Sequence, residues 1–355
     1  MNHQPVLSIS NSEIATFDRC RRKWYARYYL GASPAEPEIV GSAILGTRVH
    51  AALEGMDGYG LDPLAVLAIL YSQALEEHPD WQADINAEWD MARIMVEGYV
   101  EWAAETGADA SLRTVAVEQE VCVPFPRLPG VTLRARLDRV VLDEETGLLS
   151  FLDNKTAATF EKHEHLETDP QFLFYAVVQK LARATARSPA CLHDGGTAEG
   201  CPGCFWEPPP QVDGGIVRTL RRVKRTAASK PPYYATDSFR YSPERIEAAE
   251  LRIEAICRQI LDARRYLGMA YTGPHGGRLD VVNHVQRSEL YPSQAFGGCK
   301  SWECPFVTLC PMMDDGSDWP GVIRDSGHWK QQDPYAYNAE QADRIEFVRA
   351  ALAAR

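Results

Sequence analysis

The chain has 355 residues, of which 45% are hydrophobic and 24% are charged, as is usual for a globular protein. This length exceeds the size of most single cores, so one elaborated domain or two domains are expected. The sequence contains no apolar run of about eighteen residues, and MNHQPVLSISNSE at its start lacks the features of a secretory signal. We therefore expect no membrane span and a cytoplasmic location.

The net charge of −12 disfavours a nucleic-acid partner, because phosphate binding requires a positive field. Two basic runs interrupt this acidic background. The first contains Arg21, Arg22 and Lys23, and the second contains Arg221 and Arg222. Each run is either a solvated face of a helix or strand, or a stripe along which an acidic protein contacts DNA.

The N-terminal third of the chain has helical patterns. Helices are predicted, in chain order, at residues 10–31, 42–56, 62–77 and 88–106. Ser10 or Asn11 is expected to cap the first helix, and His50 lies in the middle of the second. The third and fourth helices are expected to form a helical insertion at about residues 57–110.

The pattern then changes to the alternation of apolar and polar residues that is typical of strands. Strands are predicted at residues 114–125, 131–143, 148–155 and 215–225. Asp169 followed by Pro170 is expected to begin a helix, with Asp169 as its N-cap. Residues 188–214 are predicted to form a loop. A long helix is expected at residues 243–268 and a surface helix at 338–353.

Two carboxylates lie on the second and third predicted strands. Asp138 and Asp153 approach each other if these strands pair, and two close carboxylates repel unless a cation lies between them. Oxygen ligands select Mg²⁺ or Mn²⁺. Lys155 shares a strand face with Asp153 and is expected to orient a water molecule. The backbone carbonyl of Asn154 and the ring of His50 would complete the metal site.

Four short motifs, GTRVH, RARLD, FLDNKT and QFLFY, occur in this order and resemble those of the PD-(D/E)XK nuclease superfamily, specifically its RecB-like branch with CRISPR-associated RecB-like exonucleases. The matching residues are Gly46 and His50, Asp138, Asp153 and Lys155, and Gln171 and Tyr175. Ala135 replaces the glycine of the G-x-x-D motif. The resemblance implies that Gln171 and Tyr175, four residues apart on one helix face, support the site.

The resemblance also implies the fold and the activity. The expected fold is an α/β, restriction-endonuclease-like core with a mixed β-sheet flanked by helices, at residues 1–310, and a C-terminal extension at 311–355. The expected activity is metal-dependent exonuclease cleavage of DNA, with single-stranded DNA as substrate. A non-catalytic DNA-binding or complex-forming subunit and a structure-specific endonuclease remain alternatives.

The nine cysteines of the chain favour metal ligation over disulfides in a cytoplasmic protein. Cys20 stands alone near the start, while Cys299, Cys304 and Cys310 form a C-terminal cysteine cluster at residues 299–310. Four thiolates suit a 4Fe–4S cluster or zinc. A subset of the family carries an iron–sulfur cluster on one cysteine before the core and three after it. This resemblance implies a structural 4Fe–4S cluster.

A second group of metal-binding residues falls in the loop at 188–214. Its members are Cys191, His193, Cys201 and Cys204, and the last two have the spacing of a zinc knuckle. Two interpretations are open, a structural Zn²⁺ site and a loop whose thiols bind no metal. A closed site with four ligands would leave no open position, so it would not be catalytic.

Overall fold

The computed structural model describes residues 7–36, 38–185, 212, 214–226, 228–272, 304–315, 317–335 and 337–353. The chain divides into two compact units, each assembled from separate stretches of sequence. The first unit comprises Met1–Ser8, Ile39–Glu250 and Ile345–Arg355, and the second comprises Ile9–Glu38 and Leu251–Arg344.

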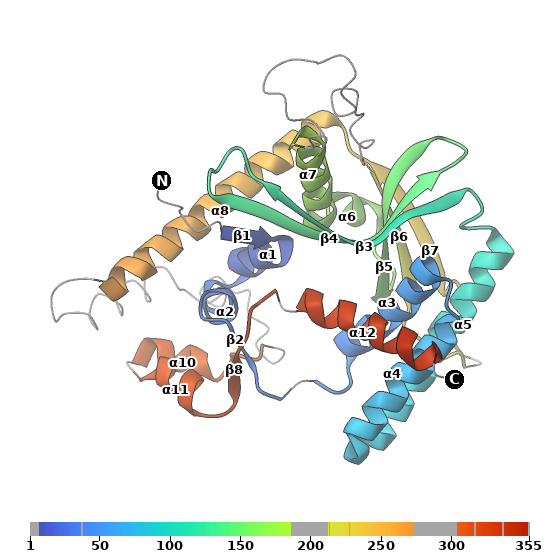
Figure 1. The fold of residues 1–355 in the computed structure, drawn as a ribbon, viewed down its shortest axis with the longest axis horizontal. Helices are drawn as coiled ribbons and strands as arrows, with labels where there is room; N and C mark the ends of the chain where they lie inside the picture. Colours follow the sequence, from blue (N-terminus) through green and yellow to red (C-terminus); the bar gives the residue numbers. More distant parts are fainter. Residues whose placement is uncertain are drawn as a thin grey trace. The chain divides into compact units, whose positions relative to one another are not determined.

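A six-stranded mixed sheet forms the centre of the first unit (Figure 1). Its strands are β1 (Leu7–Ser10), β3 (Leu112–Pro124), β4 (Val131–Asp143), β5 (Leu148–Ala157), β6 (Gly214–Arg221) and β7 (Tyr234–Arg240). The strand order is β1-β4-β5-β6-β7, and β3 also pairs with β4. Because β5 and β6 are parallel while β3–β4, β4–β5 and β6–β7 are antiparallel, the sheet is mixed, as expected.

Alternation of side chains explains why β4 forms a strand, whereas β5 and β6 are mostly buried on both faces. On β4, Val131, Leu133, Ala135 and Leu137 are buried, whereas the residues between them are partly exposed. Gly147, in the turn between β4 and β5, has a φ of 70°, a backbone conformation that glycine adopts without the steric cost of a side chain. The sequence therefore specifies both the strands and the tight connection that places Asp138 near Asp153.

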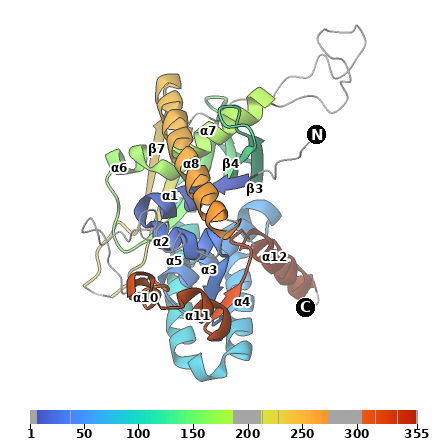
Figure 2. The ribbon, with the colours of Figure 1, turned by 90° about the vertical axis from the view of Figure 1, so that its left-hand side faces the viewer.

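Helices flank the sheet. Those of the first unit or beginning in it are α3 (Ser42–Tyr59), α4 (Pro63–Glu77), α5 (Gln82–Thr106), α6 (His163–Thr168), α7 (Pro170–Thr185) and α8 (Pro243–Thr272). In both views α3, α4 and α5 lie together (Figure 2), where they share an apolar core. Among the described helices, none is long and apolar enough to cross a membrane.

Two sequence predictions for the helices need correction. The helix predicted at 88–106 begins earlier, at Gln82, after a short 3₁₀ turn, η2 (Pro79–Trp81). The last helix, α12 (Tyr337–Ala353), was predicted to lie on the surface, but Ile345 and Val348 are buried in the core formed by α3, α4 and α5.

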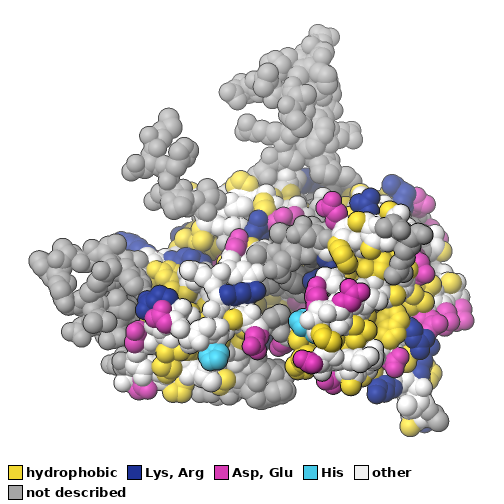
Figure 3. All heavy atoms as spheres, turned by 60° about the horizontal axis from the view of Figure 1, so that its bottom comes forward, with side chains coloured by type: hydrophobic (Ala, Val, Ile, Leu, Met, Phe, Trp, Pro, Cys, Tyr) yellow, Lys and Arg dark blue, Asp and Glu magenta, His cyan; other side chains and the backbone are white. Residues whose placement is uncertain are grey.

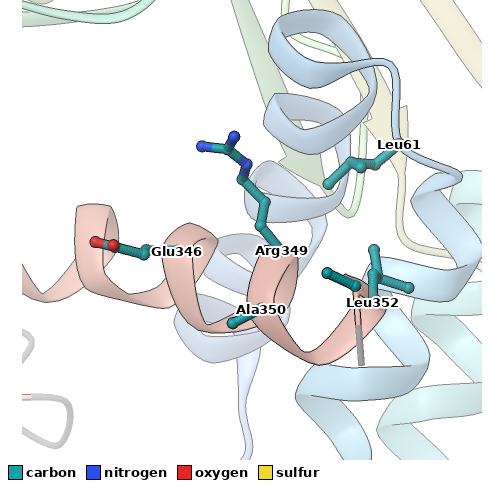
Figure 4. A pocket seen from close by; sticks show the side chains of 6 residues that line it. Leu61, Glu346, Arg349, Ala350 and Leu352 are labelled. Carbon is teal, nitrogen blue, oxygen red and sulfur yellow. The ribbon is translucent and has the colours of Figure 1, made fainter. Parts of the chain in front are cut away.

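A pocket of about 620 Å³ lies beside the C-terminal half of α12. The residues that line it are Leu61, Glu346, Arg349, Ala350, Leu352 and Ala353 (Figure 4). None of these residues belongs to the site predicted from the sequence, and the lining lacks a group of carboxylates.

The second unit brings segments from both ends of the sequence together. Its elements are α1 (Asn11–Arg19), α2 (Arg21–Trp24), the π-helical turn η1 (Tyr25–Tyr29), β2 (Ala32–Pro34), α10 (Leu309–Asp315), α11 (Trp319–Asp325) and β8 (Trp329–Gln331). Strands β2 and β8 pair antiparallel. This pairing joins sequence positions near residue 33 to positions near residue 330.

The single helix predicted at residues 10–31 is wrong. Ser10 caps α1 as expected, but the backbone at Cys20 is extended, with φ −157° and ψ 107°, and this ends the helix. The Sγ atom of Cys20 then accepts a hydrogen bond from the Lys23 backbone N–H at 3.5 Å, so Cys20 caps α2. The apolar periodicity alone does not reveal this break.

A buried carboxylate organises the second unit. Glu13 on α1 is fully buried and accepts hydrogen bonds from Trp24 Nε1 at 2.9 Å, from the Arg264 guanidinium at 2.9 Å and from the Tyr335 hydroxyl. Arg264 also lies over the ring of Trp24. Three donors from separate segments thus compensate for the burial of one charge.

Candidate active site

Three carboxylates lie in a row across neighbouring strands of the first unit. On β3 and β4, Val117 pairs with Arg139 and Gln119 pairs with Leu137, so Glu118 lies across from Asp138. The last β4–β5 pair, Arg139 with Leu152, places Asp138 next to Asp153. Side chains at directly opposite positions share a face of the sheet, so these carboxylates are close neighbours.

The row lies where β4 and β5 separate. Their pairing stops at Leu152, whereas β5 continues along β6 as far as Ala157. Side chains from two helices reach this position, His50 from α3 and Gln171 from α7. The strands therefore supply the carboxylates, and the helices supply the groups that surround them.

Asp138 is paired with His50. The distance between His50 Nδ1 and Asp138 Oδ2 is 3.2 Å, and the backbone N–H of Asn154 donates to the same carboxylate. Burial favours the neutral imidazole, but the Asp138 carboxylate outweighs it and raises the pKa of His50 to about 9. Burial also opposes the charge on Asp138, yet His50 lowers the pKa of this carboxyl below its usual range.

Asp153, Lys155, Gln171 and Tyr175 form one connected network. Lys155 Nζ lies 3.3 Å from Asp153 Oδ2 and donates to Gln171 Oε1 at 2.9 Å. Gln171 Nε2 donates to Asp153 Oδ1 at 3.3 Å and to the Tyr175 hydroxyl at 2.7 Å. Gln171 therefore contacts both residues of the D-x-K motif, and Tyr175 contacts Gln171.

The start of α7 fixes this network. The Gln171 backbone N–H donates to Asp169 Oδ1 at 2.7 Å, so Asp169 caps the helix as predicted from the sequence. Pro170 occupies the first helical position, where its missing N–H costs nothing. Because the helix begins here, Gln171 lies in the first turn of α7, facing β5.

Buried oxygen atoms remain without hydrogen-bond donors at this site. Within the described residues, Asp138 Oδ2, Asp153 Oδ2 and Asn154 Oδ1 receive no hydrogen bond. The contacts of the two aspartate oxygens with His50 and Lys155 are ion pairs. Burial, followed by repulsion from Asp138, raises the pKa of Asp153 to about 6. Such oxygen atoms are costly to bury, and a divalent cation would satisfy them.

The described part of the chain contains no group of three His, Cys, Asp or Glu side chains arranged to hold a metal ion. His50 and Lys155 instead face the two aspartates. Mg²⁺ keeps several water ligands and is commonly bound through one or two carboxylates. The pair Asp138 and Asp153 therefore fits a hydrated Mg²⁺ or Mn²⁺, with the Asn154 carbonyl as the further ligand that the sequence suggests.

Glu118 was not predicted to belong to the site. Its side chain pairs with Arg136, and its backbone has a φ of 46°, which is rare for a residue other than glycine. Burial, followed by repulsion from Asp138, raises the pKa of Glu118 to about 8. Counting residues across the hairpin from Asp138 would have identified it, but the strand pattern gives no reason to do so.

The first basic run does not form an exposed surface. Arg22 is buried and donates to the Cys310 carbonyl at 2.7 Å and to Asp314 at 2.5 Å. This corrects the prediction that Arg22 contacts DNA, because its guanidinium has partners inside the second unit. Trp24 and Tyr25, which follow this run in the sequence, are also buried. Arg21, which is partly exposed, donates to Gln259 at 2.8 Å.

The second basic run is divided between the interior and the surface. Arg218 is buried and pairs with Asp109 at 2.6 Å. Arg221 on β6 lies opposite Ala157, which comes two residues after Lys155 on β5. The Arg222 backbone N–H donates to the Ala157 carbonyl at 2.7 Å. Acidic and basic side chains are interspersed on the face shown in Figure 3. Arg221 and Arg222 are thus the basic residues of this run beside the candidate site.

Three of the four predicted cluster cysteines are described. Cys20, Cys304 and Cys310 all belong to the second unit. Burial raises the pKa of the Cys310 thiol, and nearby Cys20 and Cys304 raise it further. In this described set the sulfurs do not form a group arranged for a metal ion. Cys299, Cys191, His193, Cys201 and Cys204 lie outside the described residues.

Comparison with known proteins gives one finding. The family profile of the PD-(D/E)XK nuclease superfamily matches residues 8–311, which is most of the chain. No curated protein matches the sequence. The matched range includes every residue of the network around Asp138 and Asp153.

Proposed function

The chain belongs to the PD-(D/E)XK nuclease superfamily, and from this premise we propose that it is a Mg²⁺- or Mn²⁺-dependent DNA exonuclease of the RecB-like branch. One observation carries the proposal. Asp138 and Asp153 lie next to each other, each has a buried oxygen atom that receives no hydrogen bond, and Lys155 lies beside Asp153. Asp138, Asp153, His50 and the Asn154 carbonyl would hold the cation. When bound, it would lower the pKa of a water molecule and neutralise charge on the phosphodiester.

The side chains around the carboxylates have separate tasks in this proposal. Lys155, held at 2.9 Å from Gln171, would orient the attacking water and face the charge that develops on the phosphate. Gln171 would keep Lys155 and Asp153 in a fixed relation, and Tyr175 would hold the Gln171 amide in one orientation. His50, which pairs with Asp138, would have to release its proton in order to bind the cation.

Arg221 and Arg222 would contact the phosphates of the DNA strand. Arg221 is the last residue of β6 and Arg222 follows it, where β6 runs beside the end of β5. Arg221 already donates to backbone carbonyls, from its Nη1 to Lys230 at 3.2 Å and to Pro232 at 3.3 Å, and these contacts position the guanidinium. A cation at this position would bind a phosphate of any sequence, which suits a strand-tracking nuclease.

The test uses single-stranded DNA with free ends and a circular single strand without ends, each incubated with Mn²⁺. Cutting of the free-end substrate alone is the expected result, and Lys155→Ala, the matched control, should abolish it. Cutting of the circle would support an endonuclease instead. Binding without cutting of either substrate would overturn the proposal in favour of a non-catalytic DNA-binding subunit.

We also propose that Cys20, Cys299, Cys304 and Cys310 hold a structural 4Fe–4S cluster. Support comes from the presence of three of these cysteines in one unit, with Cys20 and Cys304 close enough to affect the pKa of Cys310. The cluster would join the N-terminal helices to the C-terminal segment. A zinc site at Cys191, His193, Cys201 and Cys204 remains a prediction from the sequence.

Metal analysis of anaerobically purified protein tests both cysteine groups. The expected result is iron with a visible absorption band, and Cys20→Ala should lose the iron and melt at a lower temperature. The exposed thiol of Cys122 provides a control, because Cys122→Ala should keep both properties. A Cys20→Ala protein that keeps its iron and its melting temperature would contradict the cluster. Zinc that disappears in Cys201→Ser would identify the second site.

A further inference from the structure

The ammonium group of Lys155 has a third neighbour besides Asp153 and Gln171. Lys155 Nζ lies over the ring of Phe172, 4.9 Å from its centroid. An ammonium within about 6 Å of an aromatic centroid is attracted to the face of the ring. Phe172 is fully buried, so little water competes with the ring for the charge.

The ring of Phe172 is itself fixed by an aromatic cluster. It stacks on Phe151 with centroids 5.6 Å apart and packs against Phe239 at 5.4 Å. Phe151 lies on β5 two residues before Asp153, and Phe172 follows Gln171 in the first turn of α7. The cluster thus ties the strand that carries Lys155 to the helix that contacts it.

We propose that Phe172 is a positioning residue for Lys155. A carboxylate, an amide oxygen and a ring face approach the ammonium, and the ring attracts its charge without accepting a hydrogen bond. Phe172 therefore holds the charge in place while leaving an N–H free to donate to a substrate oxygen. This inference rests on the proposed role of Lys155 in phosphodiester cleavage.

Fluorinated phenylalanine incorporated at position 172 tests the inference, because each fluorine weakens the negative face of the ring with little change in its size. We expect kcat to fall stepwise from phenylalanine to trifluorophenylalanine, by about threefold to tenfold in total. KM and the melting temperature should stay constant. The same series at Phe239, also buried and packed on Phe172, is the matched control and should leave kcat unchanged.

A second measurement detects the contact without activity. The ¹⁹F resonance of 4-fluorophenylalanine at position 172 should shift when Lys155→Met removes the ammonium, and the resonance at position 239 should shift less. If the protein cuts DNA but kcat does not change along the fluorine series and the ¹⁹F resonance at position 172 does not shift, this inference is wrong and the proposed function stands. If the wild-type protein cuts no DNA, the proposed function fails and the inference fails with it.

Discussion

Glu13 in the second unit and the pair Asp138 and Asp153 in the first differ in how their carboxylate oxygen atoms are satisfied. In the second unit, Glu13 receives hydrogen bonds from Trp24, Arg264 and Tyr335. In the first, one oxygen atom each of Asp138 and Asp153 receives no hydrogen bond from the described residues. A buried carboxylate that is fully paired is compatible with a stable fold. A buried carboxylate with an unsatisfied oxygen atom destabilises the fold, and proteins keep such groups at functional sites. We infer that Glu13 serves the fold, and the contrast agrees with the proposed role of Asp138 and Asp153 in metal binding.

The largest expected effect is on cleavage. Asp153→Asn should lower the rate of DNA cutting by about a thousandfold or more, because the neutral amide cannot hold a divalent cation, whose charge is worth several kcal/mol in the transition state. The melting temperature should stay the same or rise, since the substitution removes a buried charge. Asp143→Asn, at the partly exposed end of β4, is the control and should cut at the wild-type rate.

The second effect is on stability. Glu13→Ala should lower the free energy of unfolding of the protein by about 3–5 kcal/mol, because it leaves the partly buried Arg264 charge and two further donors without their acceptor. Denaturation in urea measures this change, and Glu13→Gln, which keeps an acceptor oxygen, should lose less. The comparison breaks down if Asp153→Asn destabilises the protein as strongly as Glu13→Ala.

Asp57 of α3 is an intermediate case. It lies 3.2 Å from Arg139, yet burial outweighs this contact and raises its pKa from 3.8 to about 6. The folded chain therefore binds the Asp57 proton more tightly than the unfolded chain. This contribution to stability is complete below pH 3.8 and is lost as the pH rises through about 6.

The corresponding measurement compares wild type with Asp57→Asn in urea between pH 4 and pH 7. Over this range the wild type should lose about 2–3 kcal/mol more stability than the variant, because the amide does not ionise. Parallel curves for the two proteins would show that Asp57 keeps its ordinary pKa, and that Arg139 compensates for its burial as completely as Arg264 does for Glu13.

The smallest expected effect is stabilisation by metal. Mg²⁺ at about ten times its dissociation constant should stabilise the wild-type protein by about 1.4 kcal/mol, through binding to the folded state. A variant with both Asp138→Asn and Asp153→Asn should show no such increase in thermal unfolding experiments. An equal increase in both proteins would place the cation elsewhere and would leave the unpaired oxygen atoms of the two aspartates without a chemical role.

Local sequence patterns predict much of the first unit. Alternating residues and a glycine turn indicate β4 and β5, and these strands are sufficient to predict that Asp138 and Asp153 are neighbours. The contacts of Gln171 with Lys155 follow less directly, because they depend on how α7 packs on the sheet. The motif resemblance implies that Gln171 supports the site, but it does not specify the contact with Lys155.

Other features depend on partners distant in sequence, which local patterns do not contain. In the sequence Arg22 is one of several candidate surface cations, and only the fold encloses it between Asp314 and the Cys310 carbonyl. The helix break at Cys20 and the position of Glu118 likewise depend on a cap and on strand register. Phe172 resembles any core aromatic residue, and only its distance to Lys155 distinguishes it.

The pairing of β2 with β8 affects how the protein is made. Residues Ala32–Pro34 leave the ribosome long before Trp329–Gln331, so the small sheet forms only after the segment between them has been translated. Tyr25, which the folded protein buries, packs edge-on against Trp319, with ring centroids 5.3 Å apart, and this partner is also translated much later. Nascent chains are therefore expected to expose an aromatic segment until these partners emerge, and to depend on chaperones during that interval.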